Sequence, residues 1–154
     1  MEYAWKYSYY RSLYGTAAFE AHLDEFKATA DELELSFDFE STRLAFFYFE
    51  LRFFQFYLEK NNEAIIEICH KALSYFDNLP FQFDSIRNIF VFHLIEHYLA
   101  VNSLYEAEET ILQFLKNTDP GTSAFYRYKE LLLRLYLFQG NRLMASHIFK
   151  DLKK

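Results

Sequence analysis

The chain has 154 residues, 52% hydrophobic and 21% aromatic, and this composition excludes an intrinsically disordered protein. Its 3 Gly and 2 Pro are too few for the tight turns of an all-β fold, so long helices are expected. The net charge of −6 and the lack of a Lys/Arg cluster argue against nucleic acid as a partner. No uncharged run approaches the roughly 18 residues that span a bilayer, so no membrane partner is expected either.

The single cysteine, Cys69, rules out an intramolecular disulfide and favours a reducing compartment. Glu2, Lys6 and Arg11 interrupt the N-terminal apolar residues, so we expect no signal peptide and a cytoplasmic location. The acidic surplus is concentrated in residues 1–40, which contain nine acidic and three basic residues. This surplus indicates a solvated helix face, or alternatively a docking surface for a basic partner.

Residues 1–35 are expected to form a divergent N-terminal hairpin. Tyrosines at positions 3, 7, 10 and 14 follow helical spacing, and Gly15 and Thr16 offer a turn before a second helix that runs to about residue 33. One continuous helix through Gly15 is the alternative. The tyrosine stripe either caps the end of the protein or forms the interface of a homodimer.

Residues 44–58, LAFFYFELRFFQFYL, form the most aromatic stretch of the chain. On a helix its apolar residues occupy two separate sectors, and Glu50, Arg52 and Gln55 lie between them. We therefore predict a helix buried on two sides, with two narrow polar strips open to water. Such a helix is typical of a stack of helical hairpins.

A short repeat supports the stack. The hexapeptides SFDFES (36–41) and PFQFDS (80–85) lie 44 residues apart, and each is expected to plug the gap between hairpins with two Phe side chains. Ser41, Ser85 and Ser123 align as helix starts, with Ser41 and Ser85 as N-caps. Ser103 and Glu106 predict a capping box. The resulting prediction is a single all-α domain, 1–154, with hairpins over 1–35, 41–78, 85–117 and 122–153.

The hairpins resemble a degenerate tetratricopeptide repeat array. The resemblance is carried by small residues and a terminal proline at corresponding positions, namely Ala72, Ala107, Pro120, Gly140 and Ala145. It implies a right-handed stack of about four antiparallel hairpins whose concave side, lined by the first helix of each hairpin, binds a protein or peptide. Armadillo-like or HEAT-like packing is the alternative.

One motif matches a metal site. His93, Glu96 and His97 form an H-x-x-E-H sequence, the arrangement in which inverzincin peptidases bind zinc through two His and activate water with Glu. The larger α+β scaffold of that family has no predicted strands here. Structural histidines are therefore the preferred interpretation, and we expect no metal and no cofactor.

A second constellation comes from aligning the hairpins. Arg52, Glu96 and Arg134 occupy equivalent positions with alternating charge, which predicts a charge ladder across the first helices. Neighbouring side chains complete a candidate binding groove that combines aromatic walls with paired charges. Its members are Tyr48, Arg52, Gln55, Phe92, Glu96, Arg127, Glu130 and Arg134.

These features predict a non-enzymatic module that binds a protein or peptide. The alternatives are a regulatory sensor domain that binds a signalling peptide or small ligand, and a metal-dependent hydrolase built on His93, Glu96 and His97. The sequence does not identify the partner.

Overall fold

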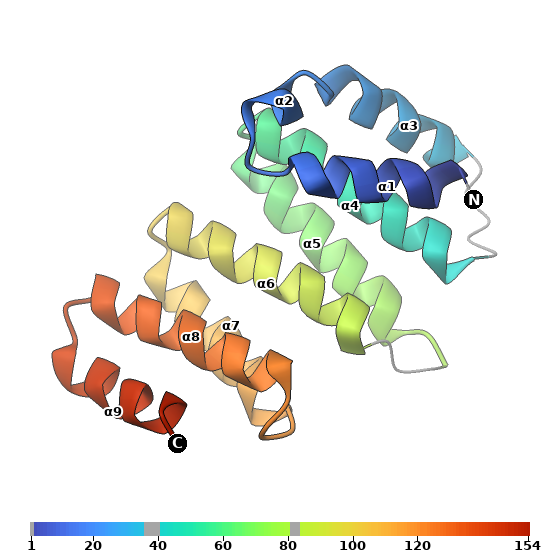
Figure 1. The fold of residues 1–154 in the computed structure, drawn as a ribbon. Coiled ribbons are helices and arrows are strands. Elements are labelled where there is room, and N and C mark those ends of the chain that lie inside the picture. The colour runs from blue at the N-terminus through green and yellow to red at the C-terminus, as the bar shows by residue number, and fades with distance from the viewer. Residues whose placement is uncertain (1, 36–40, 81–83) are drawn as a thin grey trace. The chain divides into compact units, whose positions relative to one another are not determined.

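A computed structural model describes residues 2–35, 41–80 and 84–154. Over these ranges the chain forms nine α-helices and no strand, which confirms the all-α prediction for them (Figure 1). The helices gather into two compact units, Met1–Ile86 and Arg87–Lys154. The single domain over 1–154 stays a prediction.

The first unit is built around the aromatic helix. It contains α1 (Glu2–Leu13), α2 (Ala17–Glu20), α3 (Leu23–Leu35), α4 (Thr42–Leu58) and α5 (Asn62–Asp77). In Figure 1, α1 and α3 lie on one side of α4, and α5 lies on the other. Helix α4 is therefore covered from more than one direction.

Helix α4 is buried on its predicted apolar sides and also along the two polar strips between them. Every residue from 45 to 55 is buried, as expected for a helix sandwiched between neighbours. The prediction that two polar strips of α4 face water is wrong, because Glu50, Arg52 and Gln55 are themselves buried. Packing on two sides leaves too little of the helix circumference for solvent, so these polar groups need partners within the protein.

Residues 2–35 form three helices, whereas the sequence predicted two helices or, alternatively, one continuous helix. A turn at residues 21 and 22 separates α2 from α3, and Gly15 adopts the left-handed φ of 80° that ends α1. The Thr16 hydroxyl donates to the Leu13 carbonyl at 2.6 Å and makes no side-chain cap to α2. The short α2 inserts Phe19 into the core, where its ring centroid lies 5.1 Å from that of Phe54.

The second unit repeats the hairpin arrangement. It contains most of α6 (Asp84–Ala100), together with α7 (Leu104–Lys116), α8 (Ser123–Phe138) and α9 (Arg142–Leu152). Helix α8 packs against both α7 and α9. Tyr128 on α8 is fully buried, and its hydroxyl donates to Asn88 Oδ1 on α6 at 2.8 Å. The second unit thus has its own core.

The predicted serine caps are wrong. Ser41 and Ser103 stand at the N-cap positions of α4 and α7 but accept no capping hydrogen bond, so the capping box does not form. Ser85 lies inside α6. The side-chain caps that do form use residues at the hairpin turns and at the start of α8, whose short side chains reach the free N–H groups of the first helical turn. Within the described parts of the chain they are Asn61, Thr122 and Asn141. The Phe pairs of the two hexapeptides, at 37 and 39 and at 81 and 83, lie outside the described residues.

Candidate functional site

Two adjoining pockets open on the first unit, along α4 and α5 and beside the end of α3. The larger has a volume of about 640 Å³ and the smaller about 260 Å³. Glu34, Tyr48 and Lys71 line both pockets, which therefore adjoin, and we call the two together the α4–α5 groove. The volume of the larger pocket falls within the range of ordinary ligand sites.

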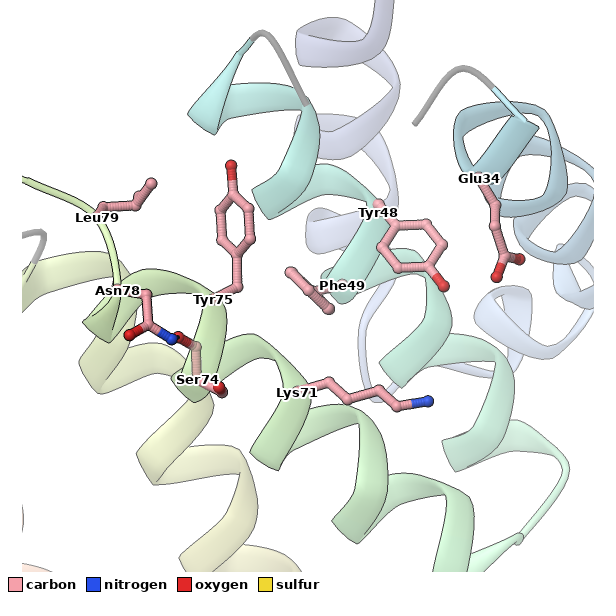
Figure 2. A pocket seen from close by; sticks show the side chains of 8 residues that line it. All are labelled: Glu34, Tyr48, Phe49, Lys71, Ser74, Tyr75, Asn78 and Leu79. Atoms are coloured by element: carbon pink, nitrogen blue, oxygen red, sulfur yellow. The ribbon is translucent and has the colours of Figure 1, made fainter. Parts of the chain in front are cut away.

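The walls of the larger pocket are aromatic. Figure 2 shows Phe49 from α4 and Tyr75 from α5 side by side, and their ring centroids are 5.8 Å apart. Tyr75 is fixed in turn by an edge-on contact with Phe76 at 5.1 Å, and Tyr48 contacts Phe49 at 5.2 Å. Burial raises the pKa of both the Tyr48 and the Tyr75 hydroxyl, so both remain protonated at neutral pH. The wall therefore combines apolar ring surface with neutral hydroxyl groups.

A buried arginine closes the smaller pocket. Arg52 Nη2 lies 2.6 Å from Asp31 Oδ1 and 2.5 Å from Glu34 Oε2, both on α3, and Nη1 donates to Gln55 Oε1 at 2.8 Å. Its guanidinium also lies 5.6 Å from the centre of the Tyr48 ring. Burial by itself would lower the pKa of Arg52, but hydrogen bonds with Asp31, Tyr48 and Glu34 raise it above its usual value. Arg52 is thus a fixed cation that joins α3 to α4.

Lys71 is the second cation of the groove. Its ammonium lies 2.6 Å from Glu67 Oε1, one turn earlier on α5, and this hydrogen bond raises the pKa of Lys71. Figure 2 shows the side chain extending from α5 towards the side of the pocket where Tyr48 and Glu34 lie. Both groups of the Lys71–Glu67 pair are largely exposed, so the pair itself stabilises the fold little.

The predicted groove residues divide between the two units. Tyr48, Arg52 and Gln55 lie together in the first unit, where Tyr48 and Arg52 line the α4–α5 groove. The other five lie in the second unit, where Arg127 pairs with Glu96 and with Glu130, the latter at 3.0 Å. The ring of Phe92 lies 4.8 Å from that of Tyr128, which is not one of the eight. The structure therefore joins three of the eight residues in the first unit and four, Glu96, Arg127, Glu130 and Arg134, in the second.

One step of the predicted charge ladder is confirmed. Glu96 Oε1 lies 3.7 Å from Arg134 Nη1, as the alignment of the first helices predicted. Arg52 has its acidic partners on α3, within its own unit. The step from Arg52 to Glu96 stays a prediction.

Sequence reasoning missed the residues that α3 and α5 bring to the groove, above all Glu34, Lys71 and Tyr75. The prediction placed the binding surface on first helices only, whereas α5 is the second helix of its hairpin. One signal was available, since Glu67 and Lys71 have the i, i+4 spacing of a helical ion pair. No comparable signal connects Glu34 to a helix that begins eight residues later.

The H-x-x-E-H residues are not arranged around a common point. His93 and His97 are buried, while the Glu96 carboxylate is paired with Arg127 and Arg134. Burial lowers the pKa of His97 and keeps its imidazole neutral. Within the part of the chain that the structure describes, no three His, Cys, Asp or Glu side chains lie close enough together to hold a metal ion.

Comparison with protein families, with curated proteins and with solved structures finds no match for this chain. The helices in the described ranges are all too short or too polar to cross a bilayer.

Proposed function

We propose that this protein is a non-enzymatic interaction module, and that the α4–α5 groove binds a segment of a partner protein. The observation that carries the proposal is the groove itself, a hollow of about 640 Å³ with ring-lined walls and charged side chains at its rim. Aromatic surface surrounded by polar groups is the usual composition of a protein-binding hot spot.

We further propose that the helices form a right-handed stack similar to tetratricopeptide repeats. Antiparallel neighbours α4 and α5 pack together, as do α8 and α9. The small residues on which the resemblance rests support this arrangement, because Ala72 and Ala107 are completely buried and Ala145 nearly so. Such positions allow two helices to approach closely.

The chemistry of the individual side chains favours binding over catalysis. The Cys69 thiol is completely buried and its pKa is raised by that burial, so it is a poor nucleophile. The carboxylate of Glu96, the candidate base of the H-x-x-E-H sequence, is held by two arginines. The metal-dependent hydrolase is therefore not the function we propose. A cytoplasmic location is part of the proposal.

Selection from a random peptide library displayed on phage tests the function. Full-length protein is expected to enrich peptides that bind it, and Ser74→Trp is expected to abolish that binding, because Ser74 is exposed on α5 and a ring there fills the larger pocket. Ser146→Trp places the same ring on the exposed surface of α9 and serves as the matched control. The proposal is wrong if no peptide is enriched, or if the two variants retain the same peptides.

A further inference from the structure

We infer that the partner segment of the α4–α5 groove is basic, and that it presents one aromatic or large aliphatic side chain flanked by Lys or Arg. The inference rests on the proposed function and adds the chemistry of the partner. Three observations carry it, namely the shape of the larger pocket, the balance of charge at the rim, and the charge of the whole first unit.

The larger pocket determines which kind of partner side chain can bind in it. Phe49, Tyr75 and Leu79 present mainly carbon to the hollow, and the Tyr48 ring faces it from the opposite side (Figure 2). Burying an apolar side chain here removes ring surface from water on both partners, which is the main source of favourable free energy in such a contact. A small side chain would leave water in the pocket. A charged side chain would lose its hydration on entering the pocket, which costs free energy.

The rim determines the flanking charges. Two carboxylates, Glu34 and Glu67, line the groove together with the cations Arg52 and Lys71, and a third carboxylate, Asp31, pairs with Arg52 from α3. Each carboxylate is more than half exposed, whereas the Arg52 side chain is only 10% exposed. A carboxylate has about four acceptor positions, so one ion pair leaves acceptors directed to solvent. Lys or Arg side chains of a partner can donate hydrogen bonds to these acceptors. An acidic partner side chain would instead have to replace Glu67 as the partner of Lys71.

The charge of the whole unit acts in the same direction. Residues 1–86 contain 15 acidic and 7 basic side chains, a net charge of −8, while residues 87–154 contain 7 acidic and 9 basic side chains. The acidic excess of the chain therefore belongs entirely to the unit that carries the groove. Such a field accelerates association with a basic segment and weakens as salt is added.

Synthetic peptides of equal length provide the test. One has a central Trp between Lys residues, one has the same Trp between Glu residues, and one has Ala between Lys residues. Fluorescence anisotropy with the full chain is expected to show that the Lys-flanked Trp peptide binds about tenfold tighter than either of the others. Its affinity is expected to fall as the salt concentration rises.

Three variants locate the effect in the groove. Glu34→Gln is expected to weaken binding of the Lys-flanked Trp peptide about threefold or more, and Lys71→Gln is expected to strengthen it. Glu63→Gln is the matched control, since it removes the same charge from an exposed position on α5 that lines neither pocket. Opposite effects of Glu34→Gln and Lys71→Gln separate charge recognition from simple loss of structure.

The inference is overturned if the Glu-flanked peptide binds as tightly as the Lys-flanked one, or if Glu63→Gln weakens binding as much as Glu34→Gln. The proposed function survives either result, because library peptides sensitive to Ser74→Trp would still show that the groove binds a partner. Failure of every library peptide removes both proposals.

Discussion

Arg52 on α4 donates a hydrogen bond to Glu34 on α3, with 2.5 Å between Nη2 and Oε2, and so joins the two helices. The same nitrogen bonds Asp31 at 2.6 Å. The arginine is buried, whereas both carboxylates remain more than half exposed. The contact therefore has a structural role at the groove, which Arg52 and Glu34 both line, and it leaves part of each carboxylate exposed to solvent.

Replacing Arg52 is expected to destabilise the protein. Arg52→Met removes charge-assisted hydrogen bonds to two carboxylates and to the buried Gln55, which should lower the free energy of unfolding by about 1 to 3 kcal/mol. Arg52→Lys should recover part of the loss, since it retains the charge but cannot form the planar fork. Urea unfolding measures both, with the exposed Arg43→Met as control. Equal midpoints for Arg52→Met and Arg43→Met would contradict the assignment.

The Glu96–Arg127 pair in the second unit is expected to contribute little. Both side chains are more than a third exposed, so solvent screens the attraction. A double-mutant cycle with Glu96→Ala and Arg127→Ala should give a coupling of about 0.5 to 1 kcal/mol, and molar salt should reduce it. The longer Glu96–Arg134 contact, at 3.7 Å, should give a smaller coupling. A coupling of several kcal/mol would show that Glu96 is far more buried in solution.

Tyr128 connects α6 and α8 through one hydroxyl group. Tyr128→Phe removes the donor to Asn88 and should cost about 1 kcal/mol of unfolding free energy, whereas Tyr128→Ala should cost about 3 to 5 kcal/mol because it opens a cavity in the core. Thermal or urea unfolding measures both. Tyr126→Phe, at an exposed position two residues away, should change stability by less than about 0.5 kcal/mol. Equal effects of the two Tyr→Phe changes would exclude a stabilising Tyr128–Asn88 hydrogen bond.

His97 should make stability depend on pH. Its Nε2 is buried without a hydrogen-bond partner among the described residues, and burial lowers the pKa of its imidazole in the folded state. The unfolded chain then binds more protons than the folded one as pH falls below about 6.5, so the stability present above this pH is lost on acidification. The His97→Gln variant has no imidazole at this position, so it is expected not to show this loss of stability at low pH.

Urea unfolding of wild type and His97→Gln between about pH 5 and pH 8 checks the prediction. The wild type should lose stability relative to the variant as pH falls. The exposed His147→Gln should track the wild type throughout. Parallel pH curves for wild type and His97→Gln would mean that His97 is accessible to water in the folded protein.

The sequence by itself determined the helices and much of the core. Few Gly and Pro and the apolar pattern of residues 44–58 predicted α4, which runs from Thr42 to Leu58. The predicted hairpins 41–78 and 122–153 contain the helix pairs α4–α5 and α8–α9. The sequence also predicted the Glu96–Arg134 pair, since equivalent positions on adjacent parallel elements come close together. The serine caps failed because capping depends on local backbone geometry, and asparagine or threonine at other turns provided it.

Only the tertiary structure decided how the polar residues of α4 are satisfied and where the groove lies. Periodicity placed Arg52 on a polar strip, but α3, whose pairing residues are 18 and 21 positions earlier, covers that strip and supplies its partners. The groove likewise requires Glu34, Tyr48 and Lys71 from three different helices to meet. Helical periodicity describes one element at a time, whereas such a meeting depends on how helices pack against each other, and one chain's pattern does not encode that directly.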